Sequence, residues 1–300
     1  MTTSNGLLLL DKPAGLTSHD VVAQVRKIVN EQRVGHAGTL DPMATGLLVL
    51  GIGPSTRLLR FAQSEVKRYA GTVRLGVTTD SLDAQGSVTG EAPVPTLSVE
   101  EMNVYVESML GTQSQVPPMV SALKVGGRRL HEMAREGLEV VRAPREITVS
   151  EFRLTSRDDA EEWDFEVECT AGTYVRVLLS DLAEKVGTVG HLTALRRISS
   201  GRHNVDQART LDEFAHDFED GPSPLRPPVD FVTQLESVVL SEDQERRLRM
   251  GQRVQFDISF TTLEIAALNE RGALVGILHP RGEQWKPELV LPADEPPRAH

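Results

Sequence analysis

One carboxylate in a glycine- and proline-rich loop is the side chain of this sequence best placed to do chemistry. Asp41 lies between a loop that begins at Gly35 and the apolar run Gly46–Leu50, which is typical of a buried strand. Pro42 fixes the backbone beside the acid, so we expect a rigid loop. On local grounds alone Asp41-Pro42 is more typical of an ordinary turn. His36, five residues before the acid, fits either a core position or half of an acid–base pair.

Three further polar side chains lie in a strand or at the start of a helix that the sequence predicts. Lys67–Gly76 alternates as a strand with Tyr69 on one face, where a core position is the simplest explanation for an aromatic residue. Tyr174 and Arg176 lie at the start of a helix expected over Thr173–Val186, at a junction from which side chains can project.

The elements before and after the loop are expected to hold it in place. Gly6–Leu10 is typical of a buried strand, and the turn after it contains Lys12, most simply a solvated residue. Thr17 or Ser18 can cap the helix that follows. A second short helix is expected over Pro54–Ala62.

Further strands are expected downstream. Glu146–Thr155 and Trp163–Ala171 predict a pair of strands, and Leu192–Ile198 predicts a short strand or a turn. Thr79–Gly86 is a polar turn, and we expect its two aspartates, one of which is Asp83, to be solvated.

Charge and composition limit the classes of function. The chain has 300 residues, 39% of them hydrophobic, which is enough for a core and for about two domains. The net charge of −11 argues at face value against a nucleic-acid partner. However, Arg157–Glu168 and Asp212–Asp220 carry −6 and −5 and account for the whole excess. A basic surface that contacts RNA is therefore allowed elsewhere.

Cysteine usage and hydropathy predict a compartment. Cys169 is the only cysteine, which excludes an intramolecular disulfide and suits a reducing environment, so we expect a cytoplasmic protein. No apolar stretch reaches the length needed to span a bilayer, and Leu7–Leu10 is too short for the core of a signal peptide.

The composition of the chain changes in three places. Pro117–Arg145 holds six Lys or Arg against three Glu, which suits an insertion that grips an RNA backbone, although a solvated surface excursion also explains it. A proline-rich linker ends a first domain expected over residues 1–228. A small β-rich module is expected over residues 229–293, and residues 294–300 are expected to form a disordered tail.

Four segments carry motifs in a fixed order over roughly the first two-thirds of the chain. They are L-L-L-L-D-K-P-A-G-L-T-S-H-D from Leu7, G-H-A-G-T-L-D-P-M-A-T-G-L-L from Gly35, K-R-Y with R-L-G-V-T-T-D-S-L-D-A-Q-G from Lys67, and G-T-Y-V-R with H-L-T-A-L-R-R from Gly172. Together they resemble the motifs of the tRNA pseudouridine-55 synthases, the TruB family of pseudouridine synthases.

The resemblance implies a fold and a reaction. The implied fold is α+β: a mixed, largely antiparallel sheet with flanking helices and a central cleft, followed by a small C-terminal β-rich module in the place of the family's RNA-binding PUA domain. The implied reaction is the isomerisation of uridine to pseudouridine in tRNA, at position 55 of the T-loop, after the base has left its stack.

The resemblance also implies roles for the polar residues of the motifs. Asp41 would be the nucleophile, and Arg176 would keep it ionised. Tyr69 would stack on the displaced base and could take the proton from C5, with Tyr174 beside it. His36 would occupy the space that the flipped base leaves.

Five further residues are expected to contact the RNA. Lys12 would lie near the catalytic loop or the RNA backbone, and Leu195 of the late motif is a candidate contact for the substrate base. Lys124, Arg128 and Arg129 of the basic insertion would neutralise phosphates.

The expected partner is the T-stem-loop of tRNA. We expect the protein to be a monomer and not to bind a membrane. No metal, nucleotide or redox cofactor is implied, and no cluster of metal ligands is evident in the sequence. One alternative is a catalytically weak protein of the same fold that binds or folds tRNA, which would need Asp41 or Arg176 replaced. Another is a phosphohydrolase with Asp41 as phosphoryl acceptor, but the second acid that it needs is replaced by Met43.

Overall fold

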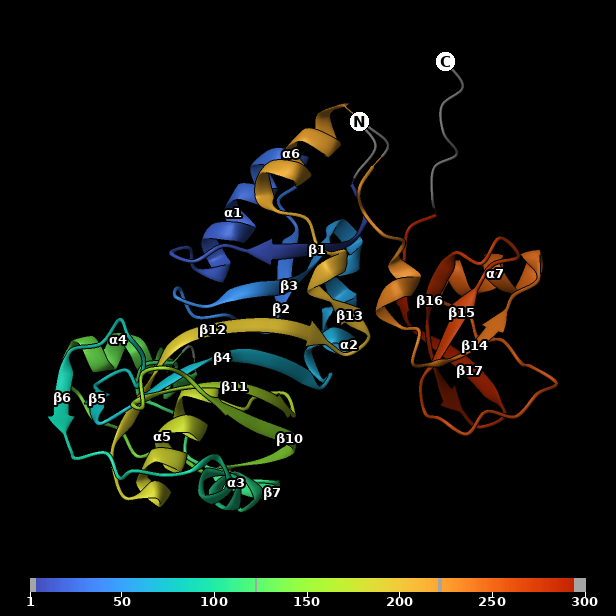
Figure 1. The fold of residues 1–300 in the computed structure, drawn as a ribbon. Helices are drawn as coiled ribbons and strands as arrows, with labels where there is room; N and C mark the ends of the chain where they lie inside the picture. The colour runs from blue at the N-terminus through green and yellow to red at the C-terminus, as the bar shows by residue number, and fades with distance from the viewer. Residues whose placement is uncertain (1–3, 122, 221–222, 294–300) are drawn as a thin grey trace.

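The computed structural model describes residues 4–121, 123–220 and 223–293. Two main sheets organise these residues, one of nine strands and one of four, which lie on the left and right of Figure 1. Within the described residues, no helix is long and apolar enough to span a membrane.

The nine-stranded sheet is mixed but largely antiparallel. Its order is β1-β3-β12-β4-β11-β10-β7, with β2 paired to β3 and β13 paired to β12, and the parallel neighbours are β3 and β12. Its strands are β1 (Gly6–Lys12), β2 (Val34–Ala37), β3 (Thr45–Ile52), β4 (Lys67–Leu75), β7 (Gly111–Gln115), β10 (Arg145–Ser156), β11 (Glu162–Cys169), β12 (Gly190–Ser200) and β13 (His203–Asn204). Two small pairs stand apart, β5 (Val77–Thr79) with β6 (Val88–Glu91) and β8 (Lys124–Val125) with β9 (Arg128–Arg129).

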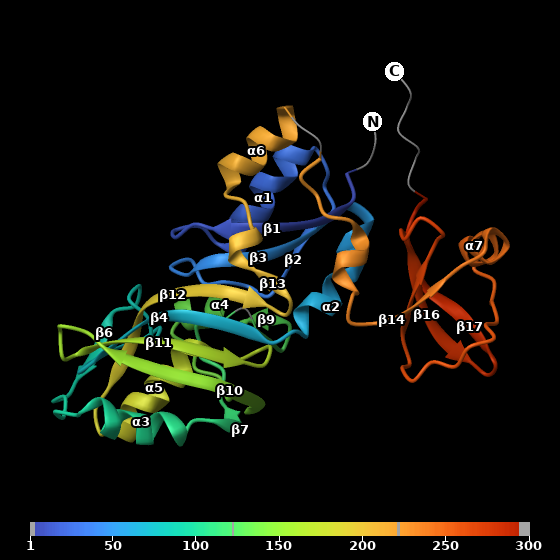
Figure 2. The ribbon, with the colours of Figure 1, turned by 45° about the vertical axis from the view of Figure 1, so that its right-hand side comes forward.

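Two groups of helices pack on the nine-stranded sheet, as Figures 1 and 2 show, while other helices lie apart from it. The helices are α1 (Ser18–Val29), α2 (Leu59–Gln63), α3 (Val99–Glu107), α4 (Leu130–Arg135), α5 (Val175–Val186), α6 (Leu211–Asp220) and α7 (Glu242–Arg249), with 3-10 turns at Gly53–Leu58, Val205–Gln207 and Pro228–Phe231. Helices α3 and α5 bury residues such as Val106 and Leu178 in one core with β4, β10, β11 and β12. Helices α1 and α6 bury Val21 and Phe214 against β1 and β3.

The C-terminal sheet has the order β14-β15-β16-β17 and packs on the larger domain. Its strands are β14 (Glu236–Val239), β15 (Ile265–Leu268), β16 (Leu274–Arg281) and β17 (Gln284–Val290). Ile277 and Leu289 of this sheet share a core with Phe61 of α2 and Leu47 of β3. The α+β fold class expected from the sequence, with a small β-rich module at the C-terminus, is confirmed.

One local expectation, the placement of His36 in a loop, was wrong, and two elements differ in length or helix type from the expectation. Leu192–Ile198 lies in β12, an eleven-residue strand at the centre of the sheet. His36, placed in a loop by its glycines, lies in β2. The helix expected over Pro54–Ala62 begins as a 3-10 turn and becomes α-helical at Leu59. In these places the long-range pairing of strands or the packing of the chain overrides the local pattern.

Gly46 allows the loop that contains Asp41 to enter β3 against β12. Its φ is +99°, and a Cβ there would lie 2.3 Å from the carbonyl oxygen of Arg197. Both the backbone conformation and the contact exclude larger residues.

We therefore predict that Gly46→Ala lowers the free energy of unfolding by roughly 3 kcal/mol or more, because strain and a backbone clash add. The matched control is Gly187→Ala, at a φ of +89° with nothing within 4 Å of the added Cβ. It should cost only about 1 kcal/mol. Urea unfolding of both variants measures the difference, and equal losses would show that the contact with β12 does not matter.

Candidate active site

Asp41 lies in the loop between β2 and β3, and the segment after β1 holds this loop in place. The Leu40 amide donates a hydrogen bond of 2.9 Å to Ser18 Oγ, and Ser18 Oγ donates one of 3.2 Å to the Leu40 carbonyl. The Gly15 amide donates to the carbonyl of Pro42 at 2.8 Å. The loop is therefore fixed on both sides of the acid.

Arg176 holds the Asp41 carboxylate with two nitrogens. Its Nε lies 3.0 Å from Oδ2, and its Nη2 lies 3.3 Å from Oδ1. Arg176 is itself only 2% exposed and donates to the carbonyls of Ser81 at 2.6 Å and Val120 at 3.0 Å. Bidentate pairing of this kind fixes both the position and the direction of a carboxylate.

Asp83 is a second acid at Arg176, which the sequence did not lead us to expect. Its Oδ2 lies 3.6 Å from Nη1 of Arg176, and it is 4% exposed rather than solvated. Its Oδ1 accepts hydrogen bonds from the Ser81 hydroxyl and the Gln85 amide. The turn over Thr79–Gly86 folds in on itself, and its internal hydrogen bonds make that burial tolerable.

Opposing forces act on the protonation of Asp41. Burial raises the pKa of its carboxyl group, Arg176 opposes that shift by charge and hydrogen bonding, and Asp83 adds to it through repulsion. The carboxylate is therefore ion-paired, and its side chain remains 36% exposed, so that a substrate can reach it.

A cavity of about 320 Å³ opens at this ion pair. Its lining brings together the three predicted catalytic residues, Asp41, Tyr69 and Arg176, and two predicted substrate-binding residues, Tyr174 and Leu195. A larger hollow of about 920 Å³ runs along β4, β11 and β12; Leu195 lines both, but Asp41 and Arg176 line only the smaller one.

The two tyrosines are held differently. Tyr69 is 7% exposed on β4, and burial raises the pKa of its phenol. Gln115 clamps the backbone of Tyr174: its Oε1 accepts from the amide at 2.8 Å, and its Nε2 donates to the carbonyl at 3.1 Å. Burial raises the pKa of Tyr174 as well. The clamp positions the residue that begins α5 and thereby Arg176.

Lys12 is buried at the catalytic loop, so its interpretation as a solvated turn residue was wrong. Its Nζ donates to the carbonyls of Pro13 at 2.8 Å, Leu16 at 2.6 Å and Pro42 at 3.3 Å. Burial lowers the pKa of Lys12 to about 8, while the nearby charge of Asp41 acts against that shift. Lys12 thus ties the loop to the end of β1.

His36 is not among the residues that line the cavity with Asp41. Its ring meets that of His19 edge-on at 5.6 Å, and its buried Nδ1 has no hydrogen-bond partner among the described residues. Burial lowers the pKa of His36 to about 4. At neutral pH this imidazole is therefore uncharged.

The basic insertion is described only in part. The backbone of Lys124 and Arg129 forms β8 and β9, but the side chains of both residues lie outside the described structure. Arg128 is exposed and pairs with Glu136 at 2.6 Å.

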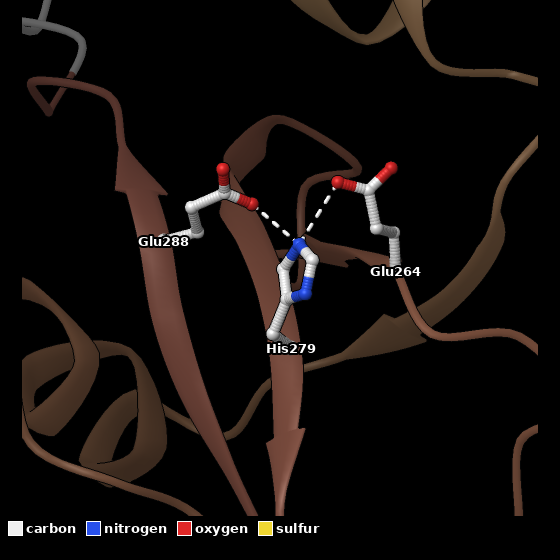
Figure 3. A group of neighbouring side chains, drawn as sticks. All are labelled: Glu264, His279 and Glu288. Atoms are coloured by element: carbon white, nitrogen blue, oxygen red, sulfur yellow. Dashed lines mark hydrogen bonds and ion pairs between the residues drawn. The ribbon is translucent and has the colours of Figure 1, made fainter.

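A group of potential metal ligands, which the sequence did not reveal, lies where the two sheets meet. Figure 3 shows Glu264 and Glu288 on either side of His279, whose Nε2 lies 2.9 Å from Oε1 of Glu264 and also contacts Glu288. The same two carboxylates pair with Arg60 of α2, at 2.7 and 3.1 Å. Because an arginine already balances their charge, we interpret the group as an ion-pair contact between the domains.

Comparison with solved structures shows which known chains share this fold. A chain of the structure described as "Structure of H/ACA RNP bound to a substrate RNA containing 2'-deoxyuridine" matches 97% of this chain and 86% of its own, with a TM-score of 0.73 at 20% identity. A chain of the "Crystal Structure of a Cbf5-Nop10-Gar1 Complex" matches 95% and 84%, with a TM-score of 0.71 at 24% identity. The chain thus shares the fold of these two chains over nearly its whole length.

Sequence comparison then gives the family. The N-terminal domain of the TruB family of pseudouridylate synthases matches residues 26–175. The tRNA pseudouridine synthase B of Streptococcus pneumoniae is 39% identical over 293 residues, 96% of this chain and 99% of that protein. The protein of the same name from Mycobacterium tuberculosis is 47% identical over 216 residues, 71% of this chain and 72% of its own. The chain belongs to the TruB family and is a pseudouridine synthase, an isomerase.

The lowered pKa of His36 predicts a loss of stability in acid. Above about pH 6.5 His36 is neutral in both the folded and the unfolded protein. At lower pH the unfolded chain binds a proton at this residue, whereas the folded chain does so only near pH 4. The resulting loss of stability is on the order of 3 kcal/mol at most. His36→Asn should therefore flatten the fall in the free energy of unfolding between pH 6.5 and 4, measured by urea unfolding. The control is His216→Asn, at an exposed histidine on α6, and equal slopes for wild type and His36→Asn would contradict the prediction.

Proposed function

We propose that this protein converts uridine to pseudouridine in tRNA, at position 55 of the T-loop, with Asp41 as the nucleophile. The observation that carries the proposal is the bidentate pairing of Asp41 with Arg176 inside a cavity of about 320 Å³. The names of the relatives from Streptococcus pneumoniae and Mycobacterium tuberculosis, each a tRNA pseudouridine synthase B, support tRNA as the substrate. The four sequence motifs support position 55.

The reaction breaks the bond between N1 of uracil and C1′ of ribose, turns the base and joins C5 to C1′. The uridine must leave its stack before a protein group can reach that bond. In the cavity, Tyr69 and Leu195 offer an aromatic and an aliphatic surface to the base, within reach of Asp41. The carboxylate then attacks C1′ or C6, or takes a proton from C2′; the same position serves all three routes.

Arg176 has two tasks in this scheme. Its charge keeps Asp41 ionised against the burial that raises the pKa of the acid. Its two contacts also fix the direction in which the carboxylate oxygens point. Holding a reacting group in the productive geometry accounts for a large part of many enzymatic rate enhancements.

The remaining surfaces would bind the RNA. We propose that the insertion over residues 117–145 grips phosphates through Lys124, Arg128 and Arg129. Residues 1–228 would carry the chemistry, and residues 229–293, in the position of a PUA domain, would add affinity for tRNA.

Chemistry and binding should separate at Asp41. Asp41→Asn keeps the shape of the side chain but removes the nucleophile, so turnover should be lost almost completely. RNA affinity should change little, because it comes mainly from phosphate and shape contacts. Tritium release from C5-labelled uridine in a T-loop RNA measures turnover, and filter binding measures affinity.

The matched control for Asp41→Asn is Asp80→Asn, at an exposed acid in the turn between β5 and β6. This variant should retain wild-type turnover. If Asp41→Asn retains more than a few per cent of wild-type turnover, Asp41 is not the nucleophile.

The basic insertion should supply affinity rather than chemistry. Replacing Lys124, Arg128 and Arg129 together by Ala should raise KM and flatten the salt dependence of RNA binding, because fewer phosphates are neutralised. The control replaces Arg74 and Arg157, which pair with Glu161 and Asp164, and should keep the wild-type salt slope. A collapse of kcat at saturating RNA with an unchanged salt slope would contradict this role.

A further inference from the structure

Arg197 of β12 is a buried cation without an acidic partner. It is 1% exposed, and no carboxylate of the described residues lies within 4 Å of its guanidinium. Its Nε donates to the carbonyl of Leu47 at 2.6 Å, and its Nη2 donates to that of Gly38 at 3.0 Å. A buried charge is costly when no anion balances it, so its retention here calls for an explanation.

The carbonyls that Arg197 binds lie on either side of Asp41. Gly38 comes directly after β2 and Leu47 lies in β3, so one guanidinium joins both ends of the catalytic loop. Because its Nη1 would lie 3.2 Å from a Cβ at residue 38, a glycine there gives it room. Arg197 thereby fixes the spacing of the loop ends.

The same guanidinium reaches Tyr69. The two residues are direct neighbours across β12 and β4, and both line the cavity that contains Asp41. Hydrogen bonding and charge from Arg197 act to lower the pKa of the Tyr69 phenol, against the burial that raises it.

Lys67 is a second buried cation at this end of the cavity. It is 4% exposed, and its Nζ donates only to carbonyls, those of Gln63 at 3.0 Å and Glu65 at 2.5 Å. Burial and the charge of Arg197 lower the pKa of Lys67 to about 8. Two cations without a contacting carboxylate make this end of the cavity favourable for an anion. Tyr69 lines the same cavity, opposite Arg197 across the two strands and two residues after Lys67 on β4, and its phenol can become that anion.

We propose that Arg197 is a positioning residue that joins the Asp41 loop to Tyr69 and, with Lys67, stabilises Tyr69 as the phenolate that takes the proton from C5 of uracil. This inference rests on the proposed function. An ordinary tyrosine is hardly ionised near neutral pH and is therefore a poor base. In this inference, the positive charges of Arg197 and Lys67 favour the ionised form of Tyr69.

The step balances. Once C5 is bonded to C1′, the C5–H bond breaks and its proton passes to the Tyr69 oxygen, which becomes a neutral phenol. The electron pair of that bond restores the double bond between C5 and C6. The electrons of the N1–C6 double bond move to N1, which takes a proton from solvent, and Tyr69 returns its own proton to solvent before the next turnover.

The test is a C5 isotope effect combined with a pH profile. Arg197→Gln can still donate to carbonyls but has no charge, so proton removal from C5 should become slow and kcat should fall by about 10²-fold. RNA deuterated at C5 should then show a larger isotope effect than with the wild type. The rising limb of the pH–rate profile should move to higher pH by about one pH unit, because the phenolate forms less readily. Arg197→Lys, which restores the charge, should recover part of the rate.

Lys67→Gln removes the other cation and should show the same isotope effect and the same direction of pH shift. The claim therefore does not depend on whether Arg197→Gln folds. Arg68→Gln is the matched control on β4, where the arginine pairs with Glu151 and Glu166 at 3.4 and 3.2 Å, and it should behave as wild type.

Two results would overturn the inference: folded Arg197→Gln and Lys67→Gln enzymes with the wild-type rate, or slow enzymes with an unchanged isotope effect and pH profile. The second result would leave Arg197 a purely structural role. In both cases the wild type still makes pseudouridine. If the wild type makes none, the proposed function itself has failed.

Discussion

The active site depends on one ion pair between residues 135 positions apart in the chain, Asp41 and Arg176. Removing two charges from water is expensive, and the pairing compensates only when its geometry is good and the remaining hydrogen-bonding groups are satisfied. Arg176 meets that condition through the carbonyls of Ser81 and Val120. The ion pair thus requires three separate parts of the chain to be in place before the acid is held.

The central strand β12 positions several of the residues around this ion pair. It runs parallel to β3, which follows the catalytic loop, and antiparallel to β4, which carries Tyr69. One strand therefore sets the distance between the loop that contains Asp41 and the aromatic residue. Rigid strands hold a site more precisely than loops do, and the loop here is held from both sides, by Arg197 of β12 and by the segment after β1.

The sequence predicted what is local or carried by a motif. The strand at Gly6, the cap at Thr17 and the alternation through Tyr69 follow from short-range rules, and the structure contains all three. It could not predict the burial of Asp83 or Lys12, because short-range rules place an acid or a lysine in a turn at the surface. Lys12 reaches the carbonyl of Pro42 only when the chain closes on the loop that contains Asp41, and Asp83 finds its partners only when its own turn folds in on itself. Arg197 was missed for a related reason: which residue faces Tyr69 depends on the register of strands far apart in sequence.

The most direct test of this account maps pseudouridine at single-nucleotide resolution in total tRNA from cells with and without the protein. The account predicts pseudouridine at position 55 of the T-loop only when the protein is present, and no loss of pseudouridine at sites outside the T-loop when it is absent. Unchanged modification at position 55 in cells that lack the protein, with a loss elsewhere or nowhere, would contradict it.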